Sequence, residues 1–298
     1  MVHRTGIDLG GTKTEILVLG PDLEPVYRKR VATPALSYDE ILQLIAQLVA
    51  DAETELGVGT SLGIGIPGAI SPDSGLLRNS NTVCLNGRPF GSDLETLLQR
   101  EVRIENDANC FALSEALGGA ARGHDVVFGV IIGTGTGGGL VVSGQLINGP
   151  HAISGEWGHN PLPWPRDSDG EPPCYCGKNA CIETFLSGPG LAYNFEKRFG
   201  VARSSHDIVA TAAAGDETCG AMLELYLDQM ARSLALVINI VDPDAIVFGG
   251  GMSNIDSIYQ TVPKLLPDYV FSDFVATPIL KAGRGDSSGV FGAALLWE

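Results

Sequence analysis

The residues whose types and spacing suit chemistry lie in three glycine-rich segments, one strand-to-helix junction and one cysteine-rich loop. The first glycine segment reads DLGGTKT from Asp8. Gly10 and Gly11 would let backbone N–H groups approach a phosphate, and Thr12 and Lys13 add donors. Asp8 ends an expected strand, where its carboxylate can hold hydrated Mg²⁺. Thr12 stands where a Walker A loop has lysine, and an ordinary hairpin turn is the alternative interpretation.

The second glycine segment contains the pattern G-x-G-x-x-G, with a threonine inside it: Gly133, Thr134, Gly135 and Gly138. A dinucleotide-binding fold needs a helix directly after this pattern, but Leu140–Val142 continues as strand, which excludes an NAD site. Two glycine hairpins that face one cleft suit a triphosphate better. In the third segment, GGG at 249–251, Gly250 either approaches an adenosine or permits tight packing of a strand on a helix.

Three carboxylates are candidates for binding a hydroxyl-bearing substrate or for taking a proton from it. Asp107 follows Asn106 where an expected strand leads into a helix, and a simple N-cap is one interpretation of it. The functional interpretation is a base that takes the proton of a sugar hydroxyl as its oxygen attacks phosphorus. Glu156 and Glu183 flank the cysteine-rich loop, which would bring both together as acceptors for sugar hydroxyls. Alone, each is more often a surface charge.

The cysteine-rich loop reads CYCGKNAC and presents three sulfurs within eight positions. With one upstream imidazole it forms a Cys₃His set that suits tetrahedral zinc: His159, Cys174, Cys176 and Cys181. Four protein ligands leave no open position, so this metal would be structural. Chance clustering and redox chemistry are the alternatives.

The elements that must position these residues alternate short β-branched strands with amphipathic helices, which is typical of an α/β protein. Helices are expected at 38–56, 107–118, 217–241, about 256–266 and 286–297, and strands at 62–66, 102–105 and 245–248. Residues 130–144 align without gaps to residues 6–20. Unless this is coincidence, it predicts a duplicated fold of two lobes that each contribute one glycine turn.

Composition limits the class of protein. At 298 residues with 44% hydrophobic content, the chain is expected to be globular, with about two domains. The net charge of −16 offers no positive footprint for nucleic acid or for a membrane surface. No apolar stretch nears the roughly 20 residues of a membrane span, and no signal peptide follows Arg4. We therefore expect a cytoplasmic protein that binds neither nucleic acid nor membrane.

Taken together, these motifs resemble the ROK family of sugar kinases (repressor, open reading frame, kinase). The resemblance runs from Gly6 nearly to the C-terminus, with the motifs in family order: DLGGTK, NDAN, IGTGTGGG, EWGH, CYCGKNACIE and GGG. It implies an α/β fold of two actin-like, hexokinase-like (ribonuclease H-like) ATPase lobes. Residues 1–118 plus 286–298 would form the small lobe and 119–285 the large lobe with the zinc loop. A homodimer is also implied.

The resemblance assigns roles to individual residues. Asp107 would be the catalytic base, and the sugar contacts would be Asn81, Asn106, Glu156, His159 and Glu183. ATP with Mg²⁺ would bind along Asp8, Gly10, Gly11, Thr12, Lys13, Gly133, Thr134, Gly135 and Gly250. Structural Zn²⁺ would bind His159, Cys174, Cys176 and Cys181. The sequence departs from the family in having Ala180 where members often have glycine.

Within the family, LNGRPF at 85–90 and GHNPLPW at 158–164 resemble fructokinases of the manno(fructo)kinase type. We therefore expect phosphorylation of the 6-hydroxyl of D-fructose, with mannose or glucose second. Bulky Trp157 and Trp164, if they face the cleft and not the core, would leave little room for an N-acetyl group. An N-acetylglucosamine kinase or glucokinase is the alternative. A sugar-sensing ROK repressor is less suited, because the phosphate motif begins at Gly6 and leaves no room for a DNA-binding segment before it.

Overall fold

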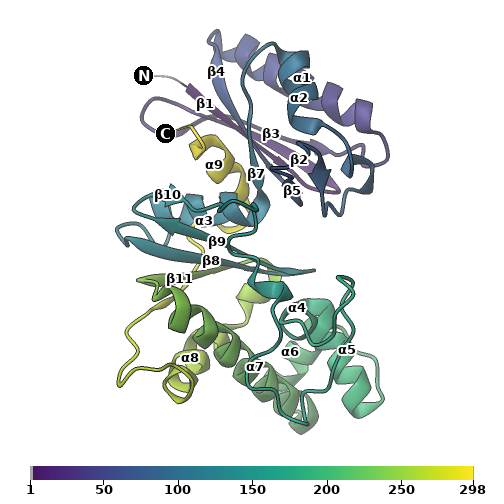
Figure 1. The fold of residues 1–298 in the computed structure, drawn as a ribbon, viewed down its shortest axis with the longest axis vertical. Coiled ribbons are helices and arrows are strands. Elements are labelled where there is room, and N and C mark those ends of the chain that lie inside the picture. The colour runs from purple at the N-terminus through teal and green to yellow at the C-terminus, as the bar shows by residue number, and fades with distance from the viewer. Residues whose placement is uncertain (1–2, 298) are drawn as a thin grey trace.

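Two five-stranded sheets, each covered by helices, dominate the computed structural model, which describes residues 3–297 (Figure 1). The first sheet has the order β3 (Pro25–Ala32), β2 (Lys13–Leu19), β1 (His3–Leu9), β4 (Thr60–Ile66), β7 (Arg103–Asn106). The second has the order β10 (Gln145–Leu146), β9 (Thr136–Val142), β8 (Val126–Ile132), β11 (Ala245–Gly249), β12 (Ile279–Lys281). The expected α/β fold is confirmed. Residues 1, 2 and 298 of the expected small lobe lie outside the described residues.

The two sheets repeat one topology. In the first, β1 pairs antiparallel with β2 and parallel with β4, and in the second, β8 pairs antiparallel with β9 and parallel with β11. The last paired residues around the first turn are Leu9 and Thr14, with four residues between them. Around the second turn they are Ile132 and Thr136, with three residues between them. A gapless alignment of 6–20 with 130–144 therefore cannot keep both strands in register, and that detail of the expectation is wrong.

Helices cover the outer face of each sheet (Figure 1). Over the first sheet lie α1 (Tyr38–Leu56) and α2 (Phe90–Leu98), whose apolar residues join those of β1, β2 and β4 in one core. Over the second lie α5 (Gly188–Phe199), α6 (Ser205–Ala213), α7 (Glu217–Val241) and α8 (Asp256–Leu265), around a second core. Short α4 (Glu183–Leu186) precedes α5, and a small hairpin of β5 (Ala69–Ile70) and β6 (Leu77–Arg78) projects from the first lobe.

Two helices fill the space between the sheets. The helix α3 (Asp107–Gly118) packs on β8 and β9, whereas α9 (Ser288–Leu295) packs on β1 and β4, and the two helices pack on each other. Glycines in the first sheet allow this approach: a Cβ on Gly6 would lie 2.1 Å from the carbonyl oxygen of Val290, and one on Gly63 would lie 1.9 Å from that of Ala293. Because α3 packs on the second sheet, the division of lobes after residue 118 stays a prediction.

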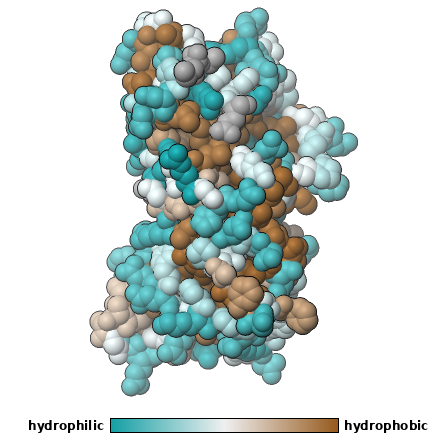
Figure 2. Space-filling model, turned by 90° about the vertical axis from the view of Figure 1, so that its left-hand side faces the viewer, coloured by the Kyte–Doolittle hydropathy of each residue, from teal (hydrophilic) through white to brown (hydrophobic). Residues whose placement is uncertain are grey.

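Figure 2 shows one face of the molecule, with hydrophilic side chains over much of both lobes, hydrophobic side chains exposed among them, and a narrowing between the lobes. Within residues 3–297, no helix is long and apolar enough to cross a bilayer.

Candidate active site

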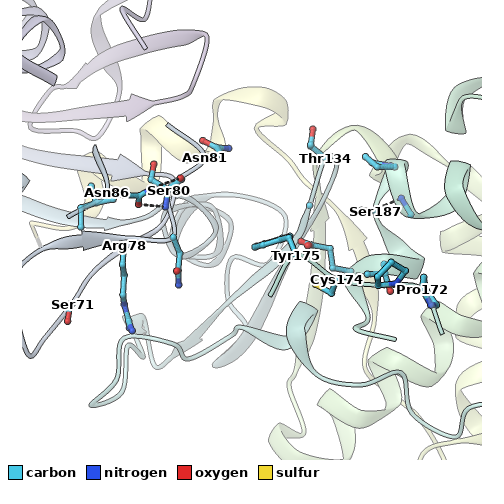
Figure 3. Close-up of a pocket in the computed structure, with 18 of the residues that line it drawn as sticks. Ser71, Arg78, Ser80, Asn81, Asn86, Thr134, Pro172, Cys174, Tyr175 and Ser187 are labelled. Atoms are coloured by element: carbon cyan, nitrogen blue, oxygen red, sulfur yellow. Dashed lines mark hydrogen bonds between the residues drawn. The ribbon is translucent and has the colours of Figure 1, made fainter. Parts of the chain in front are cut away.

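A cleft of about 1120 Å³ opens between the lobes. One side is formed by the β5–β6 hairpin and the segment after it, including Arg78 and Asn81, and the other by the second glycine turn and the cysteine-rich loop. Figure 3 shows Arg78 and Asn81 facing Thr134 and Tyr175 across this space. Five residues singled out in the sequence line the cleft: Asn81, Thr134, Gly135, Cys174 and Glu183.

The strand-to-helix junction places Asp107 at the first position of α3. The N-cap is its neighbour Asn106, whose Oδ1 accepts the N–H of Ala108 at 2.9 Å. The Nδ2 of Asn106 donates to the carbonyl of Gly68 at 3.0 Å, so both polar ends of that side chain already have partners. Asp107 also accepts the N–H of Ala108, at 2.8 Å, but it is not the cap residue. The simple capping interpretation therefore belongs to Asn106.

Four carboxylates form a series, from Glu183 through Glu156 and Asp107 to Asp8, in which the charge of each raises the pKa of the next, and of these Glu183 lines the cleft. Burial, followed by the charge of Asp107, raises the pKa of Asp8 to about 7. Burial also raises the pKa of Asp107 to about 6, with the charge of Glu156 adding to it and the N–H of Ala108 opposing it. Burial raises the pKa of Glu156, where His159 opposes and Glu183 adds. Segments far apart in sequence thus bring Asp8, Asp107, Glu156 and Glu183 close enough to interact.

The first glycine turn lies against the segment that carries Asn81. A Cβ on Gly11 would stand 3.7 Å from Asn81 Oδ1. The N–H of Gly10 donates within the turn to the carbonyl of Lys13 at 3.0 Å, so this donor is engaged in the free protein. Thr12 and Lys13 are exposed.

The second glycine turn is bound to Glu183. The N–H of Thr136 donates to Glu183 Oε2 at 2.9 Å. A Cβ on Gly135 would lie 2.8 Å from that oxygen, so only glycine lets the carboxylate come this close. The N–H of Gly188 donates to the carbonyl of Gly133 at 2.8 Å, which joins the turn to the start of α5. As expected, strand and not helix follows this turn, consistent with the exclusion of an NAD site.

A second cavity, of about 830 Å³, lies behind this turn and shares Thr134 and Pro189 with the first. Its lining includes Gly133, Gly251, Met252 and residues of α6 such as His206 and Val209. No motif in the sequence indicates the α6 residues, because a short helix with a polar start is also typical of the protein surface. Gly250 has φ +82°, and a Cβ there would lie 2.4 Å from the carbonyl oxygen of Ile132. It permits tight packing, and its neighbour Gly251 lines the cavity.

The cysteine-rich loop gathers the four expected metal ligands. The ligand atoms of His159, Cys174, Cys176 and Cys181 all lie within 4.8 Å of one another. Cys176 Sγ is 3.6 Å from Cys181 Sγ, and Cys174 Sγ is 3.6 Å from His159 Nδ1. Tetrahedral zinc with Zn–S bonds of about 2.3 Å would hold its ligand atoms about 3.7 Å apart. The donor set and its spacing fit zinc.

A model of the ROK family matches residues 4–298. The chain belongs to the ROK family. It is 42% identical to the N-acetyl-D-glucosamine kinase of Yersinia pseudotuberculosis serotype O:3 (strain YPIII), over 98% of this chain and 97% of that protein.

Solved structures of ROK proteins are similar to this chain over nearly its whole length. The ROK hexokinase from Thermus thermophilus has a TM-score of 0.88 at 29% identity, covering 98% of this chain and 97% of that one. The ROK glucokinase from Streptomyces griseus, in complex with glucose and AMPPNP, has a TM-score of 0.77 at 26% identity, covering 99% and 98%. The expected family of sugar kinases is confirmed, but the expected fructokinase branch is not: the curated relatives at 42% identity are N-acetyl-D-glucosamine kinases.

Trp157 and Trp164 of this ROK protein do not narrow its cleft. Trp157 is 4% exposed, donates its Nε1–H to the carbonyl of Gly137 at 2.9 Å and packs edge-on against Phe128 in the core. Trp164 is half exposed and stacks on Tyr269 with ring centroids 5.7 Å apart. Neither is among the described residues that line the interlobe cleft. The expected exclusion of an N-acetyl group by these rings is wrong.

Proposed function

We propose that this ROK protein is an ATP-dependent kinase that transfers the γ-phosphoryl group to the 6-hydroxyl of N-acetyl-D-glucosamine. The observation that carries the reaction is Asp107, a carboxylate at the start of α3 whose pKa of about 6 suits a general base near neutral pH. The substrate is supported by relatives of that activity at 42% identity over nearly the whole chain. It replaces D-fructose, which the sequence motifs favoured.

In the reaction, Asp107 accepts the proton of the sugar hydroxyl while the hydroxyl oxygen attacks the γ-phosphorus and ADP leaves. Mg²⁺ bound with ATP would supply the positive charge that neutralises the phosphates. Asp8 would hold this ion, because carboxylate oxygens are ligands that Mg²⁺ prefers and because Asp8 and Asp107 otherwise repel each other. The glycine turns would bind the triphosphate, with the adenosine in the second cavity beside Gly251.

The sugar would lie between Asp107 and the pair Glu156 and Glu183. Carboxylates accept hydrogen bonds from several sugar hydroxyls at once, which fixes the orientation of the ring. Asn106 would have to contact the sugar in addition to its bonds to Ala108 and Gly68. Zinc on the cysteine-rich loop would hold the segment of His159 and Glu183 in place. Closure of the lobes would exclude water, which competes as phosphoryl acceptor.

The experiment is a coupled ADP-release assay with N-acetylglucosamine, glucose, mannose and fructose at saturating MgATP. We expect the largest kcat/KM for N-acetylglucosamine. The analogue without a 6-hydroxyl should bind but give no phosphorylated product by mass spectrometry. A larger kcat/KM for fructose would restore the fructokinase prediction, and ADP release that no sugar stimulates would contradict the kinase itself.

A further inference from the structure

Tyr175 lies in the cleft between two expected zinc ligands, Cys174 and Cys176, and has no role so far. Its side chain is 81% exposed although it lines the interlobe cleft. Figure 3 shows it projecting from the second lobe toward the side that carries Asn81. An exposed side chain that lines the cleft is available to a ligand bound there.

One hydrogen bond and one ring contact hold Tyr175. Its hydroxyl lies 3.0 Å from His159 Nε2, and the two rings meet edge to face with centroids 5.2 Å apart. The other nitrogen of His159, Nδ1, points at Cys174 Sγ. When Nδ1 is a metal ligand, Nε2 carries the ring proton and donates it to the tyrosine oxygen. The hydrogen of the tyrosine hydroxyl is then free to be donated to something else in the cleft.

Tyr175 lines the same cleft as Glu183, one of the two carboxylates expected to bind the sugar. Glu156, Glu183 and Asp107 accept hydrogen bonds when ionised but donate none. They suit the O–H and N–H groups of a sugar and cannot bind a carbonyl oxygen.

We propose that Tyr175 is a specificity-determining residue that donates its hydroxyl hydrogen to the carbonyl oxygen of the substrate's acetamido group. This inference rests on the proposed function, because the acetamido group is what separates N-acetylglucosamine from glucose. The carboxylates serve the groups that both sugars share. Tyr175 serves the one acceptor that only the N-acetyl sugar has.

The test is Tyr175→Phe, which keeps the ring and removes the donor. A single hydrogen bond is worth roughly 3–10-fold in binding. We expect kcat/KM for N-acetylglucosamine to fall by about 3–10-fold, chiefly through KM, while kcat/KM for glucose changes less than about twofold. Calorimetric binding of each sugar without ATP should show the same split. Tyr27→Phe is the control, since Tyr27 lies on β3 and is not among the described residues that line the cleft, and it should leave both sugars unaffected.

Three other outcomes overturn the inference. Equal losses for both sugars would mean that the hydroxyl only supports His159. Unchanged selectivity would mean that it does not contact the acetamido group. Loss of bound zinc from Tyr175→Phe, but not from Tyr27→Phe, would mean that it acts through the metal loop. Wild-type protein inactive on N-acetylglucosamine would overturn the proposed function as well, and that failure is visible before any variant is measured.

Discussion

Glu115 accepts a hydrogen bond from the hydroxyl of Ser288, with 2.7 Å between Oε1 and Oγ, and this bond joins the two helices that lie between the lobes. Its other oxygen accepts the N–H groups of Ala120 and Gly283 at 2.8 and 2.9 Å. The side chain of Glu115 is fully buried. Ala120 and Gly283 lie in the two stretches where the chain passes between the sheets. The carboxylate of Glu115 therefore joins both of the chain segments that connect the two lobes.

Glu115→Gln should destabilise the protein, because an amide nitrogen cannot accept the hydrogen bonds that converge on this carboxylate. A buried N–H group left without a partner costs about 1–3 kcal/mol, so we expect a loss of about 2–4 kcal/mol in the free energy of unfolding. Denaturant unfolding measures it. The control is Glu101→Gln, at a glutamate whose side chain is 65% exposed, where stability should change by less than about 0.5 kcal/mol. Equal stability of the two variants would refute a structural role for the hydrogen bonds of Glu115.

Asp107→Asn should nearly abolish turnover while sugar and ATP still bind. The amide cannot take the proton of the attacking hydroxyl, and loss of a general base typically lowers the rate by about 10²–10⁴-fold. Steady-state kinetics and calorimetric binding together separate the two effects. Asp39→Asn, at an exposed residue in the first turn of α1, should keep full activity. Turnover above about a tenth of wild type would show that Asp107 is not the base.

The pH profile should report the same group. Asp107 must be ionised to accept a proton, and burial raises its pKa to about 6. At saturating MgATP, where bound Mg²⁺ would keep Asp8 ionised, we therefore expect kcat/KM for the sugar to be flat above that pH and to fall tenfold per pH unit well below it. An ordinary aspartate would instead lose activity only near pH 4. A loss of kcat/KM centred near pH 4 would count against a raised pKa of Asp107. The Asp107→Asn variant should not show the loss of activity at low pH.

Protein purified without chelator should contain one zinc per chain, held by the four ligands of the cysteine-rich loop. Cys176→Ser should lose most of this zinc and raise KM for the sugar, because His159 and Glu183 flank the same loop. Cys84→Ser is the control: Cys84 Sγ donates to the carbonyl of Ala35, a bond that serine can also form, and zinc should be retained. Elemental analysis with parallel kinetics decides the matter. Full activity in metal-free protein would disprove the assignment.

Helices were predictable where local signals agree. The helix α1 begins after Ser37, whose side chain accepts the N–H of Glu40, and apolar residues recur at helical spacing up to its end at Leu56. The bounds of α3 and α7 were likewise expected, and α9 is shorter than expected, at Ser288–Leu295. Repeated Gly/Thr turns predicted the duplicated topology. They could not reveal the extra residue in the first turn, because strand register depends on pairing.

The sequence predicts which residues are candidates for the site, but it predicts little of how they are arranged. Residue types and family order pointed to Asp107, Glu156 and Glu183, but only the fold shows that Asp8 lies near Asp107. Whether Trp157 faces the cleft or the core could not be predicted, because its neighbours Phe128 and Gly137 lie on β8 and β9. Glu115 gave no signal, since its partners at 283 and 288 lie more than 150 residues away in sequence. Contacts across such distances come from packing, which local patterns do not encode.

The position of α9 has a consequence for how the chain is made. The strands β1 and β4 emerge from the ribosome early, but the helix that covers them at Gly6 and Gly63 is among the last segments to be translated. Until then, one apolar face of the first sheet stays open to chaperones or to other nascent chains. A premature stop codon that removes only residues 288–298 would therefore damage the half of the protein that was translated first.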